Sequence, residues 1–275
     1  MSMENTLWEI YSRQIMMKEI GETGQQKLLD ASVLVVGCGG LGAPVLYYLT
    51  AMGIGHLGLC DGDVVSLSNL NRQVLYTMED IGKPKARTAE KRLLELNPGL
   101  NTTIYERFMD EKLAETIIPG YDIAVDCLDN FAARFILNDA CIKAGKPFVH
   151  AGVGEFNGQL LTVTPGTGPC LRCLFPKGIQ KKEPAKPSGI IGTVPGATPG
   201  ATSDAIGATP GIIGATPGVI GALQALEVLK YLLGLPVSND GMVIYDGLNM
   251  SLEKIPMEAS PECACAHGRE PKQNK

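Results

Sequence analysis

The segment GCGGLG (Gly37–Gly42) is the first pattern in the chain that could do chemistry. Its glycines have the spacing G-x-G-x-x-G, and they follow an apolar, β-branched run that begins at Ser32. Glycines at a strand-to-helix turn let backbone N–H groups approach a phosphate, which the N-terminus of the next helix also attracts. Asp61 ends the next apolar run, where a carboxylate can accept hydrogen bonds from ribose hydroxyls. The pattern favours an adenosine-nucleotide site over a turn that only packs.

Cationic and amide side chains follow Asp61 closely: Asn69, Arg72, Gln73 and Lys85. The β- and γ-phosphates of a triphosphate need charge-assisted donors of this kind. A pyrophosphate already held by a helix N-terminus needs fewer of them, so a triphosphate fits better than a dinucleotide. The alternative interpretation is that these cations are ordinary solvated surface side chains.

Two carboxylates lie in the segment VDCLDN, at the end of a later apolar run. Ligands of an open parallel sheet bind beyond the carboxyl ends of its strands. Asp129 could hold Mg²⁺ there against the phosphates, because Mg²⁺ usually takes one or two carboxylates together with substrate oxygens. Asp129 could also cap the helix that begins near Phe131, alone or in addition. Asp126 is expected to be buried and structural, as are His56 and His150.

Four of the eight cysteines form two separated pairs. Cys170 and Cys173 have the spacing CxxC, Cys263 and Cys265 the spacing CxC, and His267 follows. Such pairs predict a structural tetrahedral Zn²⁺ site that holds the chain end to the core, with free thiols as the alternative. Either Cys265 or His267 completes the ligand set. The remaining cysteines are expected to be buried apolar side chains: Cys38, Cys60, Cys127 and Cys141.

Apolar runs alternate with helical patterns over residues 32–152, which predicts a doubly wound, mostly parallel sheet. After residue 152 the strands within Gln159–Gly166 and Met242–Met257 lack intervening helices, so antiparallel pairing is expected. A Pro/Gly-rich connection, Pro176–Gly218, precedes a helix predicted at Val219–Leu233. We therefore predict one Rossmann-like α/β domain over 1–275. Its parts are helices in 1–31, a nucleotide-binding half in 32–152, a second half in 153–268 and a tail in 269–275.

Composition narrows the function classes. The net charge is −5 and no basic run exceeds Lys181-Lys182, so the surface charge does not favour nucleic acid. The polar first residues predict no secretory signal, and the apolar stretch 206–234 contains prolines, glycines and charges that argue against a membrane span. A cytoplasmic protein is expected, in which cysteines bind metal or are buried rather than form disulfides.

The chain resembles the MoeB/ThiF/HesA family of adenylyltransferases, relatives of ubiquitin-activating enzymes, in motifs that occur in the family's order: GCGGLG, DGDVVSLSNLNRQ, GKPKA and DCLDN. The resemblance runs from YSRQI near the N-terminus to the last cysteines. It implies ATP- and Mg²⁺-dependent adenylation of the C-terminal glycine of a small ubiquitin-like sulfur-carrier protein that ends in Gly-Gly. The products would be acyl-AMP and pyrophosphate.

The resemblance also implies residue roles. Gly39, Gly40 and Gly42 would line the phosphates and Asp61 would hold the ribose. Phosphate contacts would come from Asn69, Arg72, Gln73 and Lys85. Asp129 would bind Mg²⁺, and Arg13 would reach into the site of a partner subunit, which implies a homodimer. The CxC pair departs from the family, which commonly has CxxC at both places.

The phrase GATPG occurs at residues 196, 207 and 214, and the whole of 176–218 contains no cysteine. Some members of the family carry there a cysteine that links covalently to the carrier, so here the acyl-adenylate itself is the expected product. The copy nearest the helix, Gly214–Gly221, best matches the family's entry to that helix, where Pro217 can precede or open the first turn. The upstream copies are expected to form a lid or to be disordered. Alternatives are adenylation of another carboxylate, such as a peptide or a modified tRNA base, and a non-catalytic nucleotide-binding scaffold. A nicotinamide dehydrogenase would leave SNLNRQ unexplained.

Overall fold

The computed structural model describes residues 3–176 and 211–266. The GATPG copy at 196, most of the copy at 207, His267 and the tail 269–275 lie outside the described residues. The expectations for these segments are therefore untested.

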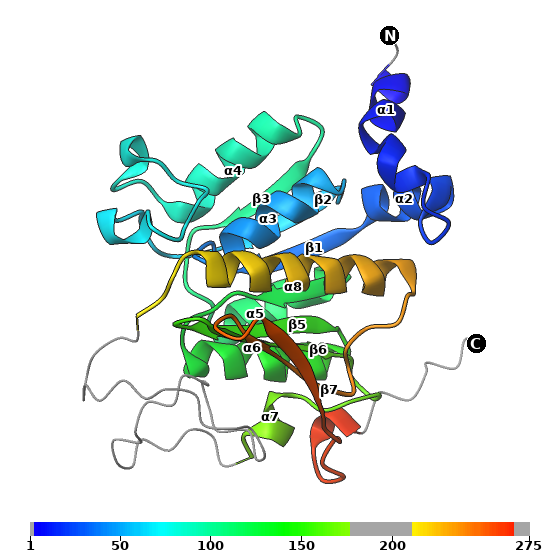
Figure 1. The fold of residues 1–275 in the computed structure, drawn as a ribbon, viewed down its shortest axis with the longest axis vertical. Coiled ribbons are helices and arrows are strands. Elements are labelled where there is room, and N and C mark those ends of the chain that lie inside the picture. The colour runs from blue at the N-terminus through cyan, green and yellow to red at the C-terminus, as the bar shows by residue number, and fades with distance from the viewer. Residues whose placement is uncertain (1–2, 177–210, 267–275) are drawn as a thin grey trace.

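A single eight-stranded sheet runs through the molecule in the order β3-β2-β1-β4-β5-β6-β7-β8 (Figure 1). The first five strands of this order pair in parallel: β3 (Asn101–Tyr105), β2 (His56–Cys60), β1 (Ser32–Val36), β4 (Ile123–Asp126) and β5 (Phe148–Gly154). The last three extend the sheet antiparallel: β6 (Asn157–Val163), β7 (Gly241–Asp246) and β8 (Ser251–Pro256). The prediction of a doubly wound parallel sheet with an antiparallel extension is confirmed.

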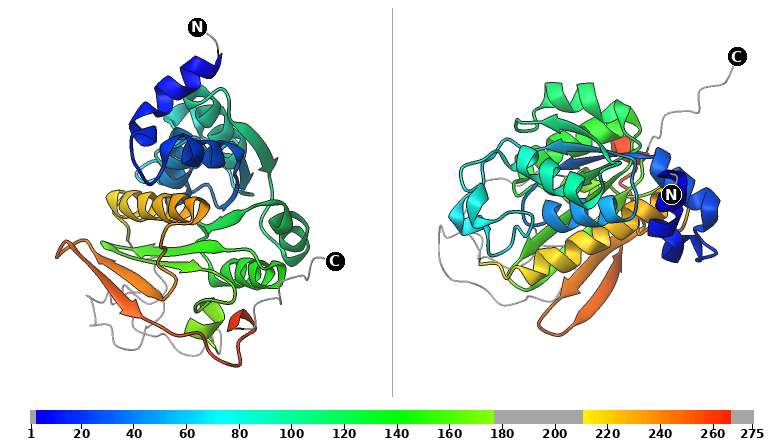
Figure 2. Two further views of the ribbon diagram at one scale, coloured as in Figure 1. Left: turned by 90° about the vertical axis from the view of Figure 1, so that its right-hand side faces the viewer. Right: turned by 90° about the horizontal axis from the view of Figure 1, so that it is seen from above.

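Helices cover both faces of the parallel part, as the views in Figure 2 show. One face carries α3 (Gly42–Ala51), α4 (Lys85–Leu96) and α8 (Ala215–Leu233), and the other carries α5 (Glu111–Ile117) and α6 (Phe131–Ala144). Beyond these layers lie α1 (Met3–Ile15), α2 (Gly21–Asp30) and the short α7 (Leu171–Leu174). Strands covered on both faces are apolar throughout rather than alternating, which explains the continuous runs in the sequence.

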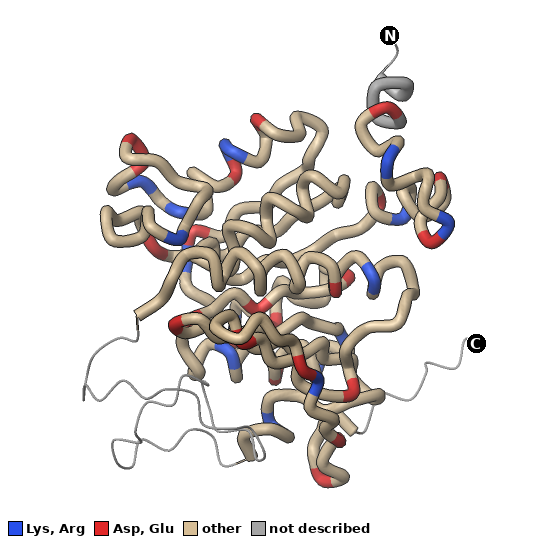
Figure 3. The backbone as a smooth tube through the Cα atoms, viewed as in Figure 1, with Lys and Arg blue, Asp and Glu red and all other residues tan. Residues whose placement is uncertain are grey.

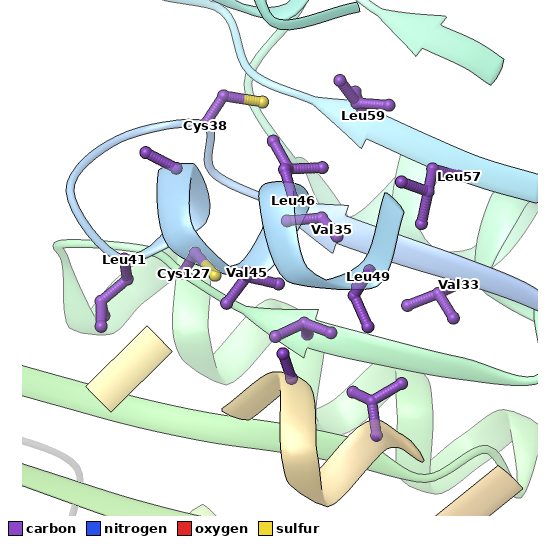
Figure 4. Close-up of a cluster of buried hydrophobic side chains, with 14 of the residues drawn as sticks. Val33, Val35, Cys38, Leu41, Val45, Leu46, Leu49, Leu57, Leu59 and Cys127 are labelled. Atoms are coloured by element: carbon purple, nitrogen blue, oxygen red, sulfur yellow. The ribbon is translucent and has the colours of Figure 1, made fainter. Parts of the chain in front are cut away.

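The core beneath α3 shows how this layer holds the sheet. Side chains of α3 such as Leu46 and Leu49 pack against Val33 and Val35 of β1 and Leu57 of β2 (Figure 4). All of these side chains are fully buried. Burying a side chain of this size contributes about 1.5–3 kcal/mol, so this layer fixes the start of α3 firmly over the end of β1.

The helix α8 begins at Ala215, four residues before the expected Val219. Pro217 is therefore the third residue of the helix, where the backbone N–H has no partner within the helix and its loss costs little. The connection between α7 and α8 is correspondingly shorter than expected. The third GATPG copy is the entry to α8, as expected, and Pro217 lies within the first turn rather than before it. The helix α5 was not predicted from the sequence.

Acidic and basic positions are mixed along the described chain (Figure 3). Among the helices of the described residues, none combines the length and the apolar character that a bilayer span requires.

Candidate nucleotide site

A cavity of about 500 Å³ lies at the carboxyl ends of β1, β2 and β4. The predicted residues that line it are Gly37, Gly39, Gly40, Asp61, Arg72, Gln73, Lys85 and Asp129. Segments that are far apart in the sequence thus meet where the topology of a doubly wound sheet places ligands. Gly42, Asn69 and Arg13 are not among the lining residues.

The glycines of the turn fall into two groups by the space around them. Gly37 has φ +99°, and a Cβ there would lie 2.5 Å from the carbonyl oxygen of Cys127. A Cβ on Gly42 would lie 2.0 Å from the carbonyl oxygen of Gly37. At Gly39 and Gly40, however, a Cβ would find only ordinary contacts at 3.5 and 3.6 Å. The outer glycines are needed to form the turn, whereas the inner ones leave room for a ligand.

The residue inside the turn is held from both sides. The N–H of Cys38 donates to Oδ2 of Asp61 at 2.7 Å, and the hydroxyl of Tyr76 donates to the Cys38 carbonyl oxygen at 2.7 Å. Asp61 also accepts from the N–H of Asp63, and burial raises the pKa of the Asp61 carboxyl. Asp61 therefore orders the glycine turn and also lines the cavity just beyond the end of β2. The role of Tyr76 was not predicted from the sequence.

The loop after β2 presents the cationic donors to the cavity. The Arg72 guanidinium donates to the Ser68 carbonyl oxygen at 2.9 Å. The Lys85 Nζ, at the start of α4 and almost fully buried, lies 3.0 Å from Oδ2 of Asp63. Gln73 is also buried, and its Oε1 has no hydrogen-bond partner among the residues that the structure describes. Arg72, Gln73 and Lys85 all line the cavity.

Asn69 has a different place from the one the resemblance implied. Its Oδ1 accepts the N–H of Ser66 at 3.1 Å, and its carbonyl oxygen accepts the N–H groups of Arg72 and Gln73. In this structure Asn69 shapes the turn that carries the two neighbouring donors and does not itself line the cavity.

Asp129 lies exposed at the cavity, just beyond β4. The expectation that Asp129 caps α6 is wrong, because Asn130 is the capping residue and accepts the N–H of Ala133 at 2.9 Å. Asparagine directly before Phe131 was the sequence signal for this role. The Asp129 carboxylate is not used in capping and, with the phosphates of a nucleotide, is suited to hold Mg²⁺.

Asp126 and His150 are fully buried, as expected for structural groups, and the His150 Nδ1 lies 2.6 Å from the Asp126 Oδ2. His56 contacts the hydroxyl of Thr103 and stacks on a tyrosine, also in a structural position. Arg134 was not predicted from the sequence, although it is 2% exposed and lines the cavity. Its only sequence signal is a lone cation on the buried face of α6.

The two cysteine pairs lie together in space, although one is in the α7 region and the other is near the end of the described residues. The sulfurs of Cys170, Cys173, Cys263 and Cys265 all lie within 4.8 Å of one another. Tetrahedral zinc with Zn–S bonds of about 2.3 Å places its sulfurs about 3.8 Å apart, so this donor set fits the ion. Cys265 belongs to the cluster. The other cysteines are buried as expected, and burial raises the pKa of the Cys60 thiol to about 12.

A glycine turn between β1 and α3, an acid after β2, cations beside the turn and a carboxylate after β4 define a nucleotide-binding α/β protein. Residues 11–266 match the model of the ThiF family. The chain belongs to this family.

Several relatives are similar over nearly the whole chain. The chain is 40% identical over 270 residues to the SAMP-activating enzyme E1 of Haloferax volcanii, covering 98% of this chain and 92% of the relative. It is 41% identical over 271 residues to the sulfur carrier protein adenylyltransferase of Thermus thermophilus, covering 96% and 92%.

The mouse adenylyltransferase and sulfurtransferase MOCS3 is 41% identical over 263 residues, which is 95% of this chain and 53% of that protein. The chain thus spans about half of this longer relative. Among solved structures, E. coli MccB with MccA-N7isoASN superposes with a TM-score of 0.76 at 24% identity, over 94% of this chain and 74% of MccB. This likeness shows the fold.

Proposed function

We propose that the protein adenylates the C-terminal glycine carboxylate of a small ubiquitin-like sulfur-carrier protein, with ATP as the donor of AMP. The observation that carries the proposal is the convergence of the glycine turn, the Arg72–Gln73 pair, Lys85 and Asp129 on one cavity. Relatives at about 40% identity are named a sulfur carrier protein adenylyltransferase and a SAMP-activating enzyme, which supports both the reaction and the kind of partner.

The site meets the demands of this reaction by placement and charge. A carboxylate attacks the α-phosphorus, a bond forms from the carboxylate oxygen to phosphorus, and the bond to the β-phosphate oxygen breaks with release of pyrophosphate. The nucleophile is already ionised at neutral pH, so no general base is required. Arg72 and Lys85 would neutralise the phosphates, and the turn at Gly39 would offer backbone N–H groups.

Asp61 would orient the ribose and Asp129 would hold Mg²⁺. The ion, when bound, neutralises phosphate charge and favours departure of pyrophosphate. Because no cysteine occurs between Leu174 and Glu262, no thiol of that segment can take the acyl group, and the acyl-adenylate is the product that leaves or is passed on.

Arg13 belongs to the proposal in a different way. It is exposed in the last turn of α1 and does not line the cavity of its own chain. We assign it to the site of a second copy in a homodimer. The four-cysteine cluster would hold a structural Zn²⁺ that ties the segment after β8 to the α7 region.

ATP–pyrophosphate exchange tests the function. Purified protein is incubated with ATP, Mg²⁺, labelled pyrophosphate and each Gly-Gly-ending carrier of the source organism in turn. Exchange should depend on one such carrier and should disappear when its last glycine is removed or amidated. Exchange that ignores the carrier, or its absence with every carrier although ATP binds, would contradict the proposal.

A further inference from the structure

We propose that Arg134 is a positioning residue that holds the turn after β4, and with it Asp129, in the orientation required for Mg²⁺-dependent ATP binding. This inference rests on the proposed function in one respect: it takes Asp129 to be the carboxylate that faces the metal. Arg134 lines the cavity, but in this role it acts through Leu128 and Asp129 rather than by contact with the metal or the phosphates.

The turn after β4 is held at Leu128, where both the backbone N–H and the backbone carbonyl oxygen are hydrogen-bonded to side chains. The Leu128 N–H donates to Oδ1 of Asp126 at 3.1 Å. The Leu128 carbonyl oxygen accepts two hydrogen bonds from Arg134, from Nε at 3.2 Å and from Nη2 at 2.6 Å. Asp129 is the next residue, so the direction of its backbone is set by this pair of contacts.

A second contact holds the other side of Asp129. The Arg134 guanidinium carbon lies 5.3 Å from the ring centroid of Phe131, within the range of a cation–π contact. Arg134 thus bridges Leu128 and Phe131 and encloses the two residues between them. One of these residues is Asp129 and the other is the helix cap Asn130.

Asp126, whose carboxylate accepts the Leu128 N–H, is itself held in place. Asp126 is fully buried, its Oδ2 lies 2.6 Å from Nδ1 of His150, and its carbonyl oxygen accepts the side-chain amide of Gln224 at 2.9 Å. The Arg134 Nε lies 4.0 Å from the Asp126 Oδ2. Charged groups from β4 and α6 thus meet a histidine from β5, and these contacts hold the Asp126 carboxylate in place.

Lysine cannot reproduce this arrangement. A guanidinium can donate two bonds to one carbonyl oxygen while its plane lies against a ring, whereas an ammonium is a point charge on a flexible stem. Arg134 is 2% exposed, and its Nη1 has no hydrogen-bond partner among the described residues, so burying it costs free energy. The geometry of the Leu128 turn is what this burial secures.

Mg²⁺ coupling separates a positioning role from a merely structural one. Without the metal, ATP would be held by the glycine turn, Asp61 and the cations. With the metal, Asp129 would add its contribution. Displacement of the turn should therefore weaken only the part of ATP affinity that Mg²⁺ adds, and the metal's effect on ATP is the coupling between the two ligands.

The test is calorimetric titration of the full-length protein with ATP, with and without Mg²⁺, for wild type, Arg134→Lys and the control Arg92→Lys. Arg92 is a partly buried arginine that donates to a buried carboxylate, that of Asp80, and it does not line the cavity. In Arg134→Lys the enhancement of ATP affinity by Mg²⁺ should fall on the order of tenfold or more, with metal-free affinity retained. Arg92→Lys should keep the wild-type enhancement.

Phe131→Leu provides a second route if Arg134→Lys does not fold, because it keeps apolar volume and removes the ring beside the guanidinium, together with the contacts of that ring with Phe135 and Phe175. It should reduce the Mg²⁺ enhancement by a smaller factor. Wild-type enhancement in folded Arg134→Lys, or in Phe131→Leu when the first variant is unfolded, overturns the inference. Absence of carrier-dependent exchange in the wild type overturns the proposed function instead, and the calorimetric comparison remains valid.

Discussion

Gly39→Ala and Gly42→Ala place the same methyl group at two positions of one turn, and each should damage a different property of the protein. A Cβ at Gly42 would lie 2.0 Å from a backbone oxygen, that of Gly37. A Cβ at Gly39 would lie 3.5 Å from the end of the Gln73 side chain, which is an ordinary contact. Gly42→Ala should therefore damage the fold, and Gly39→Ala should damage only ligand binding.

The magnitudes follow from these distances. Overpacking against backbone costs typically about 1–3 kcal/mol, and the 2.0 Å approach at Gly42 belongs in the upper half of that range. Gly39→Ala should leave the free energy of unfolding within about 0.5 kcal/mol of wild type. Its methyl group would keep phosphate oxygens from the turn, and the loss of one charge-assisted hydrogen bond costs about 1.5–3 kcal/mol. ATP affinity should then fall by about 10- to 100-fold.

Urea unfolding followed by circular dichroism gives the stability of each variant, and calorimetric titration gives its ATP affinity. The pair controls for the substitution itself, since both variants gain one methyl group in the same turn. The reasoning is refuted if Gly42→Ala is as stable as wild type. It is equally refuted if Gly39→Ala folds and binds ATP with wild-type affinity.

Other substitutions test separate parts of the molecule. Asp129→Asn should reduce carrier-dependent exchange by about 100-fold or more with an unchanged dichroism spectrum, and near-normal exchange at saturating Mg²⁺ would remove the carboxylate from the metal role. Arg13→Ala should slow exchange without weakening ATP binding, and mixed dimers with Asp129→Asn should regain activity; failure in verified heterodimers would speak against a shared site. Chelation of about one zinc per chain from the four-cysteine cluster should lower the melting temperature more than the ATP affinity, whereas an unchanged melting temperature would contradict a structural ion. Burial alone would raise the pKa of Asp80, but the Thr77 N–H and Lys83 outweigh it and hold that pKa below its usual range. The stabilisation that the ionised Asp80 gives to the fold is therefore present at neutral pH and lost as pH falls below about 4. In urea unfolding, Asp80→Asn should lower the free energy of unfolding by about 1–2 kcal/mol at pH 7 and by less at pH 3. A loss of stability that is the same at both pH values would contradict this prediction.

The strands of the parallel sheet were predictable because a strand that is buried on both faces is apolar at nearly every position. Segments such as Ser32–Val36 and His56–Cys60 are continuous apolar runs, and only a covered strand requires that. The exact start of α8 could not be predicted in the same way. Proline and glycine in GATPG disfavour a helix on average, but a proline in the first turn loses no hydrogen bond. A helix start placed from average propensities therefore falls too late in the chain.

The candidate site divides along a similar line. Residues that lie at strand ends, such as Asp61 and Asp129, could be placed from the order of strands and helices alone. Tyr76 and Arg134 could not, because their roles depend on which backbone carbonyl each side chain reaches after packing. Asp61 also holds a turn, through the N–H of Cys38, and this second role could not be predicted from its position at a strand end either.

The repeated phrase GATPG has a specific role at the position where the structure describes it in full. A Cβ at Gly214 would lie 2.3 Å from the Asn71 carbonyl oxygen, next to Arg72, and the hydroxyl of Thr216 donates to the Glu155 carbonyl oxygen at 3.0 Å. Pro217 lines the nucleotide cavity. These residues thus hold the start of α8 against the loop that carries Arg72 and against the β5–β6 hairpin. These constraints come from neighbours in the fold and not from the phrase itself, so the role belongs to the copy at 214 through the contacts of Gly214, Thr216 and Pro217.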